Sequence, residues 1–228
     1  MFVGHYSASF AGRAGEKRIP LWVLFIAVQL VDVLWAIFVL LGIEKVRIVP
    51  GITASSPLDL YYMPYTHSLV GALGWSVAAF VVCQLIPTLR GKRTGVIVAL
   101  AVFSHWVLDL IVHRPDLALY DSAFKMGFGL WNYRALAFAL EMAVLIGGAA
   151  LYLEVVPRKG RIIGFVVLLV LVQVFGTFFF PPPPSDRDMA ITALSFYGVL
   201  ALIAWWADGI RSSVHRVVGS SEKANQLH

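Results

Sequence analysis

The chain has 228 residues, of which 59% are hydrophobic and only 14% charged, and its mean hydropathy is +0.80. A soluble core cannot absorb so much apolar surface, so the composition excludes an ordinary soluble domain and indicates an integral membrane protein. The formal net charge of +5 does not indicate nucleic-acid binding, because basic residues in so apolar a chain usually mark cytoplasmic loops. The single cysteine, Cys83, excludes an intramolecular disulfide and a cysteine-rich zinc site.

The apolar segments predict an all-α membrane protein with six spans. Residues 2–12 are apolar but too short to cross a bilayer, so we expect a re-entrant or interfacial segment there. The following apolar runs have the length of about 20 residues that a spanning helix needs, and they cover residues 21–43, 66–87, 94–113, 133–156, 162–180 and 189–209. Residues 44–65 are expected to form an outer loop.

Basic residues concentrate at alternate ends of these runs and predict the topology. The basic residues in question are Arg13, Lys17, Arg18, Arg90, Lys92, Arg93, Arg158, Lys159, Arg161, Arg211 and Arg216. The positive-inside rule then places both termini in the cytoplasm, as for a multi-pass protein of a bacterial inner membrane. We expect one polytopic domain over residues 1–211 and a polar, disordered cytoplasmic tail over residues 212–228.

The end of the third apolar run carries the most informative polar residues. His105, Asp109 and His113 are spaced four residues apart and share one face of a helix. Ionisable groups in a lipid-buried helix are costly unless they are paired or coordinated. A histidine and an aspartate at this spacing can ligate one borderline cation such as zinc, and a hydrogen bond between packed helices fits the spacing equally well. His113 and the following Asp116 could be ligands, substrate contacts or exposed loop residues.

Four further polar residues are candidates for the same site. Asp32 lies in the middle of the first run, where a carboxylate is usually functional, although it could belong to a hydrogen-bond network. His67 opens the second run and His5 lies in the short N-terminal segment, and each is a weak signal alone. Glu141 in the fourth run could act as a base or a ligand, or could join two helices by a hydrogen bond.

Part of this pattern resembles a known family. The elements that carry the resemblance are Gly4-His5, Asp32, Thr66-His67-Ser68 and Ser104-His105-x-x-Leu108-Asp109. This ordered set resembles the YdjM-like family of inner-membrane proteins, which are interpreted as metal-dependent hydrolases and look distantly similar to the zinc phospholipase C and P1 nuclease group. The match covers roughly the first half of the chain. The resemblance implies a metal site formed by His5, Asp32, His67, His105 and Asp109.

Together, these observations predict a function and leave two rivals. We expect a hydrolase that cleaves a phosphoester or similar bond of a lipid-like substrate, with bound Zn²⁺ or Mn²⁺ activating a water. Glu141 or His113 is the candidate general base. The first rival is a transporter or channel that uses the same residues as an ion or proton relay. The second is a non-enzymatic membrane scaffold or regulator-binding protein.

Overall fold

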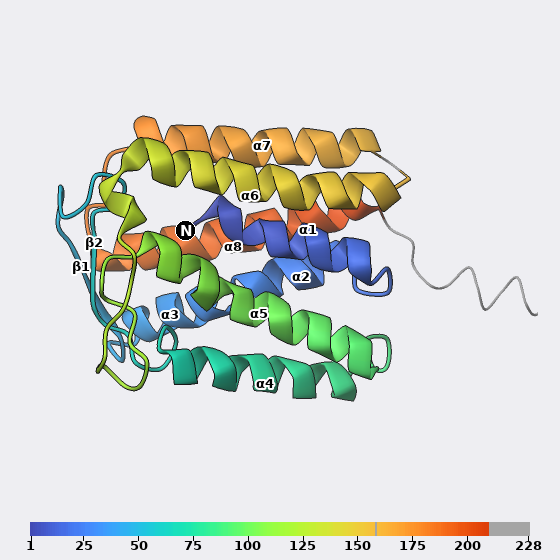
Figure 1. Ribbon diagram of the computed structural model, residues 1–228, viewed down its shortest axis with the longest axis horizontal. Helices are drawn as coiled ribbons and strands as arrows, with labels where there is room; N and C mark the ends of the chain where they lie inside the picture. The colour runs from blue at the N-terminus through green and yellow to red at the C-terminus, as the bar shows by residue number, and fades with distance from the viewer. Residues whose placement is uncertain (158, 210–228) are drawn as a thin grey trace, which may run out of the picture.

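The computed structural model of the protein describes residues 1–157 and 159–209 and is nearly all-α, with about 66% of the chain helical. The helices lie side by side along the long axis of the molecule, and a small cap covers one end (Figure 1). Four helices are long and apolar enough to span a membrane, namely α5 (Lys92–Val112), α6 (Arg134–Val155), α7 (Lys159–Phe178) and α8 (Asp186–Asp208). These four helices confirm the prediction that the last four apolar runs form helices long enough to span a membrane. The predicted tail over residues 212–228 lies outside the described residues.

The first predicted span is broken. α2 (Leu21–Val28) and α3 (Leu30–Leu40) meet at Gln29 with a bend of 52°, where the sequence predicts one continuous helix. Together they have the length and composition of a fifth span. The break interrupts the i to i−4 hydrogen-bond ladder in the middle of the bundle and so leaves backbone carbonyl groups available to other donors.

The second predicted run forms a helix, α4, that is shorter than the four spanning helices. α4 (Leu69–Leu85) has 17 residues, about 26 Å at 1.5 Å per residue, against a hydrocarbon core of about 30 Å. It begins three residues later than predicted, because Ser68 caps it by accepting a hydrogen bond from the backbone N–H of Gly71. The count of six spans therefore stays a prediction.

The N-terminal segment is helical and lies inside the bundle. A short 3₁₀ turn, η1 (Val3–His5), leads into α1 (Tyr6–Gly15), which packs against α2 and α6 with Tyr6 and Phe10 fully buried. α1 approaches α6 at Gly148, where a side chain would meet the backbone of Ser7. The segment is thus a buried element of the core, which agrees with the re-entrant alternative and not with an interfacial one.

The predicted outer loop contains a β-hairpin that forms part of the cap. β1 (Lys45–Ile48) pairs antiparallel with β2 (Leu58–Tyr62). Residues 113–133, which include the turn η2 (Leu130–Asn132), complete the cap, and Arg114 joins the two parts through an ion pair with Asp59. The cap closes the end of the bundle at which α3 ends and α4 begins (Figure 1).

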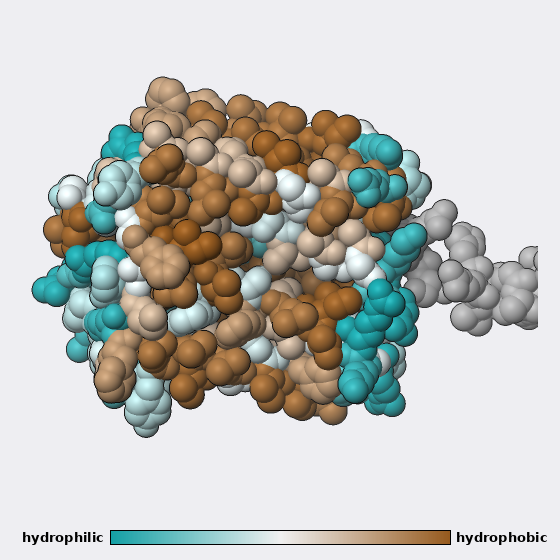
Figure 2. All heavy atoms as spheres, in the orientation of Figure 1, coloured by the Kyte–Doolittle hydropathy of each residue, from teal (hydrophilic) through white to brown (hydrophobic). Residues whose placement is uncertain are grey.

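The surface is that of a membrane protein. Apolar side chains cover the middle of the molecule on the face shown, and hydrophilic residues gather at its two ends (Figure 2). Large side chains such as Leu168, Leu171 and Leu202 are exposed on the flanks of the helices, where a soluble protein would lose stability to water. Trp205 and Trp206 are also exposed near the end of α8, as in the aromatic belts at membrane interfaces.

Candidate metal centre

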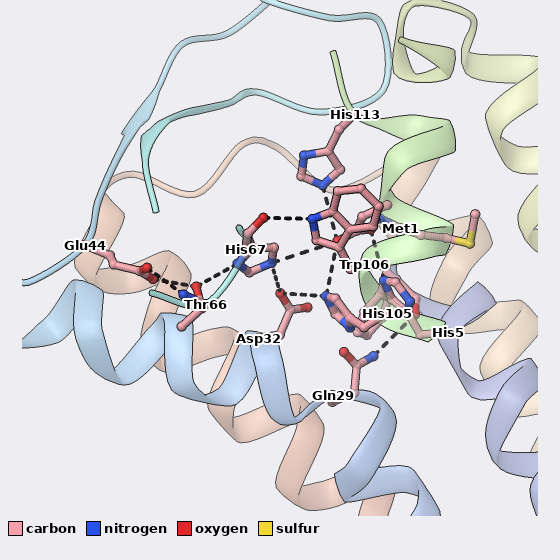
Figure 3. Close-up of polar contacts among 12 residues, drawn as sticks. Met1, His5, Gln29, Asp32, Glu44, Thr66, His67, His105, Trp106 and His113 are labelled. Atoms are coloured by element: carbon pink, nitrogen blue, oxygen red, sulfur yellow. Dashed lines mark hydrogen bonds and ion pairs between the residues drawn. The ribbon is translucent and has the colours of Figure 1, made fainter. Parts of the chain in front are cut away.

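The structure brings the five predicted ligands together. They come from η1, α3, α5 and the turn before α4, and they are His5, Asp32, His67, His105 and Asp109. Figure 3 shows the first four of them side by side. Two overlapping groups have their ligand atoms within 4.8 Å of one another, and both contain His105. His67 reaches the others because the chain enters the bundle before α4 begins, a depth that its position at the start of an apolar run did not predict.

The spacing of the donor atoms fits a metal ion. The Nε2 atom of His105 lies 3.4 Å from Asp32 Oδ1 and 3.1 Å from Asp109 Oδ2, and His67 Nε2 lies 3.2 Å from Asp32 Oδ1. Ligands bound at 2.0–2.1 Å around a tetrahedral zinc are separated by about 3.3 Å. The donor atoms thus already have separations close to those that zinc requires.

His105 presents an unpaired nitrogen to the carboxylates. Its Nδ1 atom lies 2.7 Å from the carbonyl oxygen of Val28, which can only accept, so Nδ1 carries the proton. The carbonyl is available because the helix breaks immediately after Val28. The Nε2 atom is buried and has no hydrogen-bond partner among residues 1–157 and 159–209. The Nε2 atom thus faces two carboxylates, an arrangement that is stabilised either by a second proton on the ring or by a cation that the neutral ring and the carboxylates bind together.

Thr66 and Glu44 orient the ring of His67 in the same way. The Thr66 hydroxyl lies 2.6 Å from Glu44 Oε2 and 2.8 Å from His67 Nδ1 (Figure 3). Because an ionised carboxylate only accepts, Thr66 donates its proton to Glu44 and accepts one from His67. The proton of His67 is then on Nδ1, and its Nε2 is left to face Asp32. The backbone carbonyl of His67 is also held, by the indole N–H of Trp106 at 3.1 Å.

His113, which the sequence left open as a ligand or a base, is placed like a ligand. Its Nδ1 atom lies 2.9 Å from Asp116 Oδ1, and its Nε2 atom lies 3.5 Å from Asp109 Oδ2. Arg114 pairs with the second oxygen of Asp116 at 3.3 Å and so keeps that carboxylate in place. Carboxylate–histidine pairs of this kind orient the histidines of metal sites. His67 and His105 thus direct Nε2 toward Asp32 and Asp109, and His113 directs Nε2 toward Asp109.

His5 and the terminal amino group contact the opposite oxygen of Asp109. His5 Nε2 lies 3.1 Å from Asp109 Oδ1, and the ring stacks on His105 with centroids 3.8 Å apart. The amino group of Met1 forms an ion pair with the same oxygen at 2.6 Å. Asp109 therefore has one oxygen paired with an ammonium group and one oxygen facing the three histidines.

Two further residues contact the centre from helices α6 and α8. Glu141, a predicted base, accepts the backbone N–H groups of Phe2 at 2.9 Å and Gly4 at 3.3 Å, so one of its oxygens holds η1 in place. Tyr197 donates its hydroxyl proton to Asp32 Oδ2 at 2.7 Å. Sequence reasoning missed Tyr197, because an aromatic residue in an apolar run carries no distinguishing signal.

A cavity of about 310 Å³ lies against the centre. Asp32, His67, Asp109 and Glu141 line one part of it. The rest is formed by the cap and by helices α6, α7 and α8, and this part is largely apolar. The centre is therefore buried from bulk water yet accessible to a molecule that occupies the cavity.

Comparison with known proteins does not identify a family: no family model, curated protein or solved structure matches the chain. The resemblance to the YdjM-like family therefore stays an expectation based on the motif residues.

Proposed function

We propose that the protein is a membrane-embedded, metal-dependent hydrolase that cleaves a phosphoester or similar bond of a lipid-like substrate. The observation that supports a metal is the common orientation of His67, His105 and His113. Each ring has Nδ1 held by a neighbouring acceptor and Nε2 directed at Asp32 or Asp109. Three independent acceptors orient the rings, so one helix-to-helix hydrogen bond does not explain the arrangement.

A bound Zn²⁺ or Mn²⁺ would polarise the scissile group and lower the pKa of a water molecule toward neutrality. The chain's own residues set up the rest of the site. Tyr197 holds one oxygen of Asp32, which keeps the other oxygen directed at the histidines. Glu141 lies on the cavity wall, and the oxygen that does not hold η1 would be the acceptor that takes a proton from water. His113 is the alternative base.

The cavity walls support a lipid-like substrate. Phe138 and Phe196 line the cavity from α6 and α8, whose outer faces carry exposed apolar side chains. The basic residues of the predicted cytoplasmic loops, such as Arg13, Arg93 and Arg161, lie at the end of the bundle opposite the cap. We therefore place the cap on the extracytoplasmic side of a bacterial inner membrane, with the cavity reached from that side.

The proposal is tested by metal content and turnover together. Protein purified without chelator is analysed for metals and then incubated with Zn²⁺ or Mn²⁺ and a panel of lipid phosphates. We expect bound metal and hydrolysis of at least one lipid, and loss of both in the double variant His105→Ala, Asp109→Asn. Asp186→Asn, at the exposed start of α8, is the matched control and should behave like the parent.

A parent protein that binds neither metal would contradict the proposal. A metal-loaded protein that hydrolyses no lipid but moves ions across liposomes would assign the same residues to transport.

A further inference from the structure

One residue of the cavity wall carries a buried donor that the metal centre does not use. Trp35 of α3 is 3% exposed and lines the cavity, and its indole nitrogen has no hydrogen-bond partner within the described part of the chain. An indole N–H can only donate, and a buried one normally finds an acceptor. Trp35 also contacts the centre, because its ring meets that of His67 edge to face with centroids 6.3 Å apart. The fold thus leaves a donor beside the metal ligands.

Two more polar residues line the same cavity, Ser55 from the cap and Arg134 from α6. The Ser55 hydroxyl is buried and is likewise without a partner in residues 1–157 and 159–209, and the backbone N–H of Ser55 is fixed by the carbonyl of Trp131 at 2.9 Å. Arg134, at the start of α6, donates Nε to the carbonyl of Ala54 at 2.6 Å. That bond places the guanidinium next to Ser55. Arg134 forms no ion pair with any described residue, so its charge is not neutralised by a carboxylate.

We infer that Trp35, Ser55 and Arg134 form a subsite for the oxyanion headgroup of an amphiphilic ligand. A guanidinium together with neutral donors suits the oxygens of a phosphate group, which accept several hydrogen bonds at once. The apolar side chains of Leu58, Phe138 and Phe196 line the same cavity and provide a surface for the hydrocarbon part. The ligand class is therefore an alkyl or polyisoprenyl phosphate, and not free phosphate.

The inference rests on the proposed function only in taking the cavity as the substrate site. Binding at these donors needs neither metal nor hydrolysis, so it can be measured on chelator-treated protein. The probes are dodecyl phosphate, the uncharged dodecanol and inorganic phosphate, each titrated into protein in a non-ionic detergent. We expect dodecyl phosphate to bind, and dodecanol to bind at least roughly 10-fold more weakly because it lacks the charged hydrogen bonds. Inorganic phosphate should also bind more weakly than dodecyl phosphate, because it lacks the hydrocarbon chain that the apolar wall buries.

Conservative variants locate the binding. Trp35→Phe and Arg134→Gln should each weaken dodecyl phosphate binding by roughly 10-fold, since each loses a donor to a charged group. The matched controls are Trp22→Phe, an indole on the outer surface, and Arg90→Gln, which also donates Nε to a backbone carbonyl but lies at the other end of the bundle. Both controls should bind like the parent. Because Arg134 is exposed, its variant tests the subsite even if Trp35→Phe fails to fold.

Several outcomes would overturn the subsite. Equal binding of dodecyl phosphate and dodecanol would show that only the hydrocarbon is recognised, and equal binding of inorganic phosphate would assign the donors to a free anion. If Trp35→Phe and Arg134→Gln both bind dodecyl phosphate like the parent, the indole N–H and the guanidinium bind water and not the ligand. Binding without any metal-dependent turnover would refute the proposed function alone, and turnover without an effect of these variants would refute the subsite alone.

Discussion

Replacing Thr66 by valine tests whether residues behind the histidines control metal binding. The change removes one hydroxyl and keeps a branched side chain of similar size. Two buried groups lose a partner, namely the Nδ1–H of His67 at 2.8 Å and the Oε2 atom of Glu44 at 2.6 Å. The backbone N–H groups of Tyr65 and Thr66 still donate to the other oxygen of Glu44, so that carboxylate remains anchored.

The structure allows the effect to be estimated. Loss of an outer partner of a metal-bound histidine typically lowers metal affinity by 10- to 100-fold. At 1.4 kcal/mol per factor of ten, this corresponds to about 1.4–2.8 kcal/mol of binding free energy. The metal-free protein should also lose stability. Each unsatisfied buried group costs about 1–3 kcal/mol, and because Glu44 keeps two donors we expect a total of about 2–3 kcal/mol.

The assay separates these two effects. Zinc affinity is measured by competition with a chromophoric chelator, and the free energy of unfolding of the metal-free protein is measured by denaturant titration in detergent. The control is Thr53→Val, because the Thr53 hydroxyl is also buried and makes two hydrogen bonds to Ser56, at 2.7 and 2.9 Å, but contacts no ligand. Both variants should lose stability, and only Thr66→Val should lose zinc affinity. An unchanged zinc affinity in Thr66→Val would refute the assignment of the His67 proton to Nδ1.

Two further predictions concern stability. Gly148→Ala should destabilise the protein by about 1–3 kcal/mol, because the added Cβ would lie 2.7 Å from the Ser7 Cα atom and overpack the contact between α1 and α6. Its neighbour Gly147 has nothing within 4 Å, so Gly147→Ala should instead stabilise α6 by up to about 1 kcal/mol, and equal effects in a denaturant titration would contradict the packing argument. At the opposite end from the cap, the side-chain hydrogen bond from Arg18 lowers the pKa of Glu16 from its ordinary value of 4.5. A depressed folded-state pKa contributes stability that is present above the unfolded pKa and is lost as the pH falls. The difference in the free energy of unfolding between the parent and Glu16→Gln should therefore shrink below about pH 4.5. A difference that stays constant through that range would contradict the prediction.

The helices of the second half of the chain could be predicted from the sequence because hydropathy alone determines them. The predicted runs 133–156 and 162–180 agree with α6 and α7 to within three residues at each end. The break at Gln29 could not be predicted, since one amide in an apolar window has little effect on hydropathy. The bend is accompanied by tertiary contacts that no local pattern reveals, namely the donation of His105 to the Val28 carbonyl and that of Gln29 to the Phe2 carbonyl at 3.4 Å.

The ligands of the candidate site could be predicted, whereas the residues that orient them could not. Asp32 and Asp109 are conspicuous because carboxylates are rare in apolar runs. Glu44 begins the predicted outer loop, where a charge carries no special signal, and only the folded cap makes it 1% exposed and brings it to Thr66. The sequence pattern also gave no distance between His113 and Asp109, so it left His113 open as a ligand, a base or a loop residue, and the structure places its Nε2 atom 3.5 Å from Asp109 Oδ2.

The bend between α2 and α3 has a consequence for any attempt to rebuild this centre elsewhere. A straight spanning helix satisfies its own carbonyls and so has no acceptor to offer an imidazole from a neighbour. Here the interruption supplies that acceptor at Val28, and it starts a new helix whose first turn carries Asp32. Transplanting the five predicted ligands into a designed bundle of unbroken helices would therefore leave His105 free to rotate and Asp32 misdirected. The discontinuity has to be transplanted with the candidate ligands, because its backbone supplies the acceptor that orients one of them.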